Sequence, residues 1–186
     1  LYYDAHVLKA TCAPARLVAD EGGYSVWLKP SGMYSQGSKW GDHCTLARWS
    51  ELHLEPPRPS YTVHRLDRAA RGLMLVAHNK IAAAALARLF RERLMTKEYE
   101  ATVRGQFPRS ERLTQPIDGR EAVSTVDLLE YDARHGTSRI AIRIETGRKH
   151  QIRRHLAEAG FPIVGDRLYG GACRGSLALE ATRLSF

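Results

Sequence analysis

Hydrophobic and polar residues alternate along much of this chain with the two-residue repeat of β-strands. The clearest case is residues 139–145, where Ile140, Ile142 and Ile144 would share one face of a strand. Further strands are expected at residues 24–29, 73–77, 98–104 and 124–130, with a short one at 162–164. Because strands often follow one another with no helix between them, the pattern favours an α+β fold over a doubly wound parallel sheet.

Three stretches are predicted to be helices instead, the first at residues 45–52. Asn79 suits the N-cap of a second helix over residues 80–94. The apolar face of that helix is expected to hold Ile81, Ala85, Leu86, Leu89 and Phe90. A third helix is expected over residues 150–159, closed by Gly160, because glycine accepts the left-handed conformation that ends many helices.

Length and composition indicate a globular protein. Of the 186 residues, 44% are hydrophobic and 26% are charged, which excludes disorder as the main state. We expect one domain over residues 1–186, with residues 1–20 unassigned. There is no apolar run of roughly the 20 residues that span a bilayer, and no signal-peptide pattern. Three scattered cysteines without a CxxC pair argue against a disulfide framework or a zinc site, so we expect a cytoplasmic protein.

The positive charge is concentrated in two segments. The net charge is +8, and residues 64–104 hold nine Lys and Arg against four Asp and Glu. Residues 141–174 hold seven against three, and the remaining residues sum to −1. Two basic segments favour an anionic partner, nucleic acid above all, although a solvated basic surface would give the same count.

The first candidate site is a carboxylate among arginines. Asp67 lies in the sequence His64-Arg65-Leu66-Asp67-Arg68. A carboxylate among guanidinium groups stays ionised, so it could serve as a nucleophile, a general base or a metal ligand. It could equally be one half of a structural ion pair.

A second candidate site begins at Gly147 and runs into the third predicted helix. Arg148 and Lys149 stand where that helix begins, and free N–H groups at a helix start already attract phosphate. Arg153 lies one turn further on, where it could reach an acidic group. The same residues would also fit a solvated basic helix. The histidines of this helix lack the i, i+4 spacing of a helical metal site, so we expect no metal there.

A third candidate lies on the strand expected at residues 98–104 and the residue before it. Lys97, Tyr99 and Ala101 would share one face. A tyrosine there could stack on a base or move a proton, although a cross-strand or core tyrosine is the more ordinary reading.

Taken together and in this order, these segments resemble the RluA family of pseudouridine synthases. The resemblance rests on residues 27–33 (WLKPSGM), 64–73 (HRLDRAARGL), 97–101 (KEYEA), 147–153 (GRKHQIR) and 165–170 (GDRLYG). The HRLD and GRxHQIR segments are its most specific part. The chain departs from the family at Ala70-Arg71, where Thr-Ser is usual, and at Glu180, where a histidine is usual.

The resemblance implies isomerisation of uridine to pseudouridine within RNA, with no cofactor and no metal. It also implies a mixed, largely antiparallel sheet with flanking helices and a central catalytic cleft. Asp67 would be the catalytic carboxylate, either attacking carbon 1′ of the sugar or removing its 2′ proton. Tyr99 would stack on the base and take the proton from carbon 5, and Arg153 would pair with Asp67.

The remaining roles implied by the resemblance concern RNA binding. Arg65 would help to extrude the target nucleotide, Leu66 would line the uracil pocket, and Arg148 would contact a backbone phosphate. The other substrate-binding residues would be His64, Lys97, His150 and Gln151.

We therefore expect structured RNA, ribosomal or transfer, as the partner of a monomeric catalytic domain that acts without a membrane. No separate accessory RNA-binding domain is expected. An alternative is a catalytically silent RNA-binding module on the same fold, suggested by Ala70-Arg71 and Glu180. A metal-dependent nuclease is a third possibility, for which the chain offers only isolated histidines.

Overall fold

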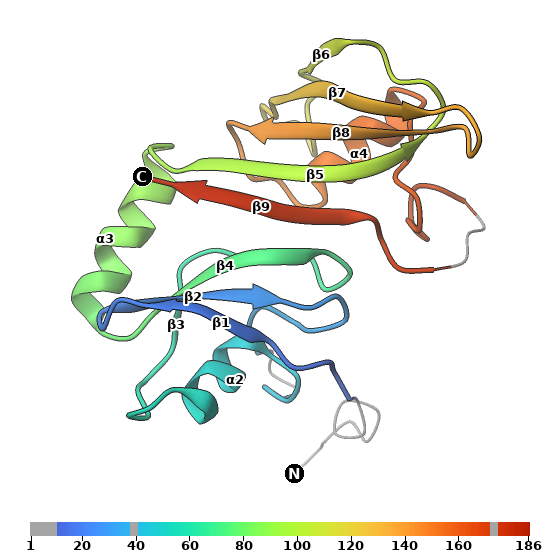
Figure 1. The fold of residues 1–186 in the computed structure, drawn as a ribbon. Coiled ribbons are helices and arrows are strands. Elements are labelled where there is room, and N and C mark those ends of the chain that lie inside the picture. Colours follow the sequence, from blue (N-terminus) through green and yellow to red (C-terminus); the bar gives the residue numbers. More distant parts are fainter. Residues whose placement is uncertain (1–10, 38–40, 172–174) are drawn as a thin grey trace. The chain divides into compact units, whose positions relative to one another are not determined.

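The computed structural model describes residues 11–37, 41–171 and 175–186 (Figure 1). The chain divides into two compact units, Leu1–Leu94 and Met95–Phe186. Within each unit the named strands pair in the antiparallel sense, and helices accompany the strands. The predicted α+β class, with a largely antiparallel sheet and flanking helices, is confirmed.

In its described residues, the first unit is built on four strands. They are β1 (Arg16–Asp20), β2 (Tyr24–Lys29), β3 (Tyr61–Thr62) and β4 (Arg71–Ala77). Strand β2 lies between β1 and β4, and β3 pairs with β4. On β2, Trp27 faces Met74 of β4, and both side chains are buried in the core. The alternation that buries Trp27 also buries Ser25 and Lys29, so the core of this unit includes polar groups.

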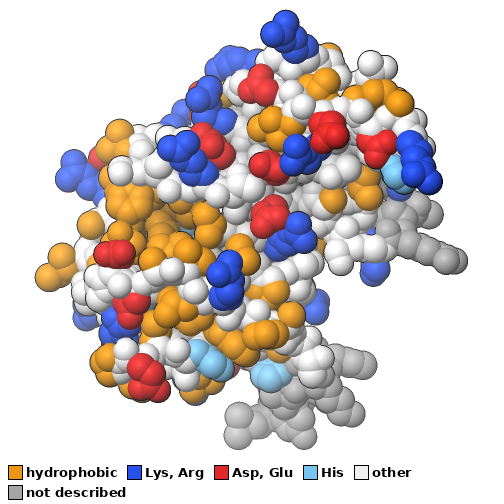
Figure 2. Space-filling view, viewed as in Figure 1, with side chains coloured by type: hydrophobic (Ala, Val, Ile, Leu, Met, Phe, Trp, Pro, Cys, Tyr) orange, Lys and Arg blue, Asp and Glu red, His pale blue; other side chains and the backbone are white. Residues whose placement is uncertain are grey.

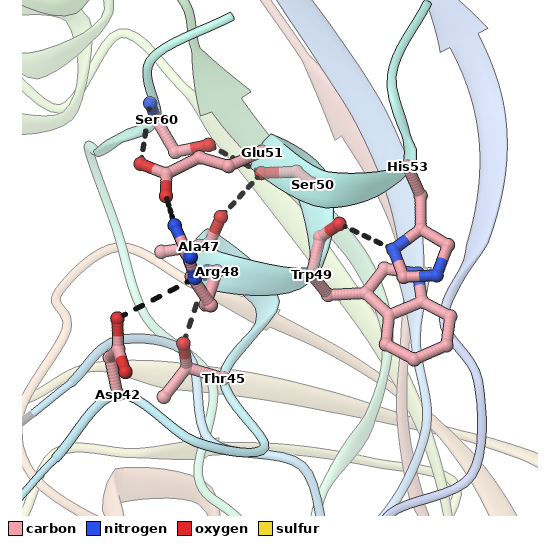
Figure 3. Close-up of polar contacts among 9 residues, drawn as sticks. All are labelled: Asp42, Thr45, Ala47, Arg48, Trp49, Ser50, Glu51, His53 and Ser60. Carbon is pink, nitrogen blue, oxygen red and sulfur yellow. Dashed lines mark hydrogen bonds and ion pairs between the residues drawn. The ribbon is translucent and has the colours of Figure 1, made fainter. Parts of the chain in front are cut away.

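Helix α2 (Leu46–His53) is capped and then tied to a distant loop by polar contacts (Figure 3). The Thr45 hydroxyl accepts a hydrogen bond from the backbone N–H of Arg48 at 3.1 Å, as an N-cap does. Arg48 pairs with Glu51 at 3.0 Å, and Glu51 in turn accepts the backbone N–H of Ser60 at 3.2 Å. The hydroxyls of Ser50 and Ser60 lie 2.5 Å apart. These contacts hold the end of the connector at residues 55–60 against the helix.

Helix α3 (Lys80–Arg91) is capped as predicted, because the Asn79 side chain accepts a backbone N–H of the first turn at 2.8 Å. Its predicted apolar face is partly wrong. Only Leu86 of that face is buried, and Ile81 is 84% exposed. The buried stripe is narrow because Ala85 is exposed as well, and Leu89 and Phe90 are only half-buried. The helix also ends three residues before the predicted boundary, and Arg93 has a left-handed φ of 59° that does not continue it.

The second unit is a five-stranded sheet in the described part of the chain, in the order β9-β5-β8-β7-β6. Its strands are β5 (Thr96–Arg104), β6 (Ser110–Leu113), β7 (Ser124–Asp132), β8 (Thr137–Ile144) and β9 (Leu179–Ser185). Helix α4 (Gln151–Glu158) covers one face (Figure 1). The isoleucines of β8 are buried, as their spacing predicted. The strand predicted at residues 162–164 is wrong: Ile163 forms only an isolated bridge with Val103, and the residues around it turn.

The face of this second sheet that lies opposite helix α4, here called the outer face, carries charges of both signs. Figure 2 shows Lys and Arg side chains interspersed with Asp and Glu over these strands. Arg139 lies 3.8 Å from Glu100 and 3.6 Å from Glu130, and Arg183 lies 4.0 Å from Glu98. Such exposed pairs add little stability. They do neutralise these arginines, so the basic residues before helix α4 are the better candidates for binding an anion.

Candidate active site

The predicted catalytic carboxylate lies in the loop between β3 and β4. Asp67 is half-buried there, Leu66 is buried and Arg65 is exposed. The backbone N–H of Ala70 donates to the carbonyl of Asp67 at 3.1 Å, which closes a tight turn. The turn therefore sets the backbone direction at Asp67 and leaves Arg65 at the surface.

The loop after β2 holds this turn through a series of hydrogen bonds. Gly32 N–H donates to the Arg68 carbonyl at 2.8 Å, and Arg68 Nε donates back to the Gly32 carbonyl at 3.0 Å. The Ser31 hydroxyl donates to the Ala69 carbonyl at 2.7 Å. Two segments more than thirty residues apart are thus joined directly after Asp67.

Lys29 forms the buried end of this connection. Its ammonium donates to the carbonyls of Pro30, Met33 and Ala70 at 3.0, 2.8 and 2.7 Å, and the side chain is fully buried. Burial lowers the pKa of Lys29 to about 8, while the negative charge of Asp67 acts in the opposite direction. Because the ammonium is committed to these backbone carbonyls, Lys29 anchors the turn that follows Asp67.

His64 connects the same loop to β4 and helix α3. Its Nε2 accepts the backbone N–H of Leu75 at 2.9 Å, and its ring stacks on Phe90 with the centroids 4.5 Å apart. An Nε2 that accepts a hydrogen bond carries no proton, so the proton of the neutral ring is on Nδ1. The substrate-binding role of His64 stays a prediction.

Tyr99 and Lys97 lie on β5, as predicted, and both are half-buried. Tyr99 is opposite Ile142 of β8 and Ala181 of β9. The register with β9 shifts between Glu98 and Tyr99, and the extra residue, Thr182, lies on β9. Tyr99 therefore sits at an irregular point in a strand that is otherwise regularly paired.

The segment before helix α4 is organised by Gln151, whose side chain is buried. Its carbonyl oxygen accepts from the Thr146 hydroxyl at 2.8 Å and from the Arg148 N–H at 3.0 Å. Its amide nitrogen donates to the Val123 carbonyl at 2.9 Å and to the Ser124 hydroxyl at 3.1 Å. All four hydrogen-bonding positions of the amide are used within the protein. These bonds fix the turn at residues 147–150, which we call the basic turn because it contains Arg148 and Lys149. A direct contact between Gln151 and substrate stays a prediction.

Arg148 and His150 stand at the surface of that turn. His150 has a left-handed φ of 54°, and its Nδ1 lies 2.9 Å from the Tyr169 hydroxyl. Arg148 Nε donates to the Glu121 carbonyl at 2.9 Å in an exposed hydrogen bond. The turn thus brings a guanidinium and an imidazole to the start of helix α4, where N–H groups favour an anion.

Arg153 makes a buried, two-point ion pair with Asp166. Its Nε and Nη2 lie 2.8 and 2.7 Å from the two carboxylate oxygens, and its guanidinium lies 5.2 Å from the centre of the Tyr169 ring. Burial acts to raise the pKa of Asp166, but hydrogen bonds from Arg153 and from the backbone N–H groups of Leu168 and Tyr169 outweigh it, so the pKa is lowered. The pairing of Arg153 with Asp67 stays a prediction.

Asp166 was missed as a site residue. Its position in the segment at residues 165–170, one of those that carry the resemblance, was the available signal.

His155 belongs to the core. It is fully buried, and its two ring nitrogens lie 3.0 Å from the Ser124 hydroxyl and 2.9 Å from the Gln115 carbonyl.

Across residues 11–37, 41–171 and 175–186, no group of three or more His, Cys, Asp or Glu side chains is arranged to hold a metal ion. Over those residues there is also no helix with the length and apolar character needed to cross a membrane.

Comparison with known proteins assigns the family. Residues 23–158 match the family described as RNA pseudouridylate synthase, so the chain belongs to that family. It is 32% identical over 180 residues to the ribosomal large subunit pseudouridine synthase D of Yersinia pestis, covering 87% of this chain and 54% of that protein. Its counterpart in Escherichia coli K12 is 36% identical over 141 residues, covering 66% and 43%. The chain spans about half the length of these relatives.

Solved structures confirm the fold. Human RNA Pseudouridylate Synthase Domain Containing 1 superposes with a TM-score of 0.79, covering 91% of this chain and 77% of that one, at 24% identity. Human RNA Pseudouridylate Synthase Domain Containing 4 gives a TM-score of 0.72, covering 90% and 82%, at 23% identity. At these identities the likeness shows a shared pseudouridine synthase fold.

Proposed function

We propose that this protein is a pseudouridine synthase that isomerises uridines in the RNA of the large ribosomal subunit. The observation that carries the proposal is the family match over residues 23–158, which includes Asp67, Tyr99 and Arg153. The ribosomal substrate is suggested by the names of the relatives from Yersinia pestis and Escherichia coli. Transfer RNA is a second candidate substrate.

In the proposed reaction, Asp67 either attacks carbon 1′ of the target nucleotide or removes its 2′ proton. The bond between carbon 1′ and N1 of uracil breaks, the uracil turns, and carbon 5 bonds to carbon 1′. In the first route this step breaks the bond between Asp67 and carbon 1′, and in the second route Asp67 returns the proton to carbon 2′. Tyr99 takes the proton that leaves carbon 5, and N1 gains one, so the product is an isomer of the substrate. A half-buried Asp67 with a fixed backbone suits this role, because a reacting group held in place lowers the entropic part of the barrier.

Arg153 is proposed to orient Asp67. Its pair with Asp166 engages Nε and Nη2 of the guanidinium. Asp166 and the ring of Tyr169 fix the guanidinium plane. A guanidinium fixed in this way would favour the ionised form of Asp67 and limit its rotation.

RNA binding would supply the free energy to extrude the target base, which costs roughly a few kcal/mol. Exposed Arg65 is proposed to fill the space that the nucleotide leaves, and buried Leu66 to line the uracil pocket. Arg148 and His150, at the start of helix α4, are proposed to contact phosphates. His64 and Lys97 complete the proposed binding set. The proposed enzyme is a cytoplasmic monomer that needs no metal or cofactor.

The first prediction tests the role of Asp67. Replacing it by Asn keeps the size of the side chain and removes the charge, so Asp67→Asn should abolish pseudouridine formation and leave RNA affinity within a few fold. Nucleosides from digested large-subunit RNA would be separated by chromatography, with the RNA taken from cells that lack the protein. Wild-type turnover by the variant would refute the assignment. RNA binding by a wild-type protein without turnover would indicate the silent RNA-binding module instead.

A further inference from the structure

Ser35 makes a reciprocal pair of hydrogen bonds with the residue directly before Asp67. Its hydroxyl donates to the Leu66 carbonyl at 2.8 Å and accepts the Leu66 N–H at 2.9 Å. Both Ser35 and Leu66 are buried, so water does not compete freely for these groups. A single hydroxyl thus satisfies both backbone polar groups of Leu66, which fixes the chain where it enters Asp67.

The backbone that carries Ser35 is itself held at the start of helix α2. Tyr34 N–H donates to the Cys44 carbonyl at 3.0 Å, and the Leu46 N–H donates to the Tyr34 carbonyl at 2.8 Å. These bonds form an isolated parallel bridge between Tyr34 and Thr45, the N-cap of α2. Ser35 therefore links the start of the capped helix α2 to the loop that contains Asp67.

Asp67 is consequently held from both sides by one segment. Ser35 binds the residue before it, while Gly32 and Ser31 bind the two residues after it. After Asp67, several hydrogen bonds together hold the chain, including the one from Lys29 to the Ala70 carbonyl. Before Asp67, the hydroxyl of Ser35 makes both of the described hydrogen bonds from this segment to the chain.

We propose that Ser35 is a positioning residue for Asp67, an inference that rests on the proposed synthase function. Without the hydroxyl, the N–H and carbonyl of Leu66 would lose a buried partner and the chain entering Asp67 would gain freedom. A displacement of about 1 Å at a reacting group can cost up to about a hundredfold in rate. The effect should fall on kcat rather than on RNA affinity, because Ser35 is buried.

Three variants test this role. Ser35→Ala should lower kcat at least tenfold with KM changed by less than a few fold. Ser35→Thr retains a hydroxyl and should restore most of kcat. The matched control is Ser25→Ala, in the same unit: its buried hydroxyl bonds Trp27 Nε1 and His78 Nε2, each at 2.7 Å. This control should lower the melting temperature without lowering kcat per folded molecule.

Hydrogen exchange gives a readout that does not depend on activity. The Leu66 amide should exchange faster in Ser35→Ala than in wild type or in Ser25→Ala, at temperatures where all three are folded. Unchanged kcat in Ser35→Ala beside an active wild type would overturn the positioning role, as would equal loss of kcat in Ser25→Ala. A wild type without turnover on any RNA would instead refute the proposed function itself.

Discussion

At the scale of single residues, buried polar side chains organise the segments that carry the proposed chemistry. Lys29 binds carbonyls beside the turn of Asp67, and Gln151 fixes the basic turn before helix α4. Asp166 holds Arg153 with two hydrogen bonds. Buried polar groups are costly unless they are satisfied, and these have several partners each. These hydrogen bonds offset the cost of burial, and they also fix the geometry of the loops around them.

The ion pair of Arg153 with Asp166 gives a prediction at this scale. Asp166→Asn should lower the free energy of unfolding by about 3–5 kcal/mol at pH 7, because it leaves a buried guanidinium without its partner. The folded pKa of Asp166 lies below its unfolded value, so its contribution to stability is present above the unfolded pKa. This contribution is lost as pH falls through the folded pKa, so the gap in free energy of unfolding between wild type and Asp166→Asn should narrow there.

Urea unfolding at a series of pH values measures this gap. The control is Asp118→Asn, because Asp118 pairs with Arg154 at 2.9 Å on the exposed surface. It should change stability far less. Equal effects of the two substitutions, or a gap that is independent of pH, would contradict the structural account of the buried pair.

At the scale of elements, the regular alternation of β8 and the Asn79 cap of helix α3 were predictable from the sequence. Strands β1, β3, β6 and β9 were missed, since each is short or largely polar, and β9 also pairs with β5, which is distant in the chain. The same reason explains the missed site residues. Ser35 contacts Leu66, and Asp166 contacts Arg153, only after folding. The candidate site residues were found because their segments resemble those of a known family. Local hydrophobic and polar patterns alone did not identify them.

Helix α3 offers a prediction at this second scale. Asn79→Ala removes the side-chain oxygen that accepts a first-turn N–H and should cost about 1 kcal/mol of stability. Ile81→Ala, two residues on, should change stability much less, since that side chain is 84% exposed. Thermal unfolding of the two variants distinguishes capping from burial. A larger loss for Ile81→Ala would show that the predicted apolar face is used after all.

At the scale of the whole molecule, a net charge of +8 is consistent with an RNA partner. The charge is not spread evenly: Arg139 on the outer face of the second sheet is paired with glutamates, whereas Arg148 and Lys149 precede the start of a helix. A basic turn at a helix N-terminus combines side-chain charge with free N–H groups. We expect this turn to contribute more to RNA binding than the outer sheet face.

Arg148→Ala should therefore weaken RNA binding and reduce the dependence of log K on log salt by somewhat less than one unit, as expected for one lost phosphate contact. Arg139→Ala is the matched control, because Arg139 lies on the outer face beside Glu100 and Glu130. Its salt slope should stay that of wild type. Fluorescence anisotropy with labelled RNA over a range of salt concentrations measures both. An unchanged slope in Arg148→Ala would remove it from the phosphate-binding role.

We propose that Asp67 drives the isomerisation of uridine in RNA, and the first measurement to make is the release of tritium from carbon 5 of labelled uridine. Ribosomal and transfer RNA from cells lacking the protein would be incubated in EDTA with wild type or Asp67→Ala. We predict release by wild type alone, and from ribosomal RNA in particular. Release by Asp67→Ala at the wild-type rate, or none by wild type from either RNA, would contradict it.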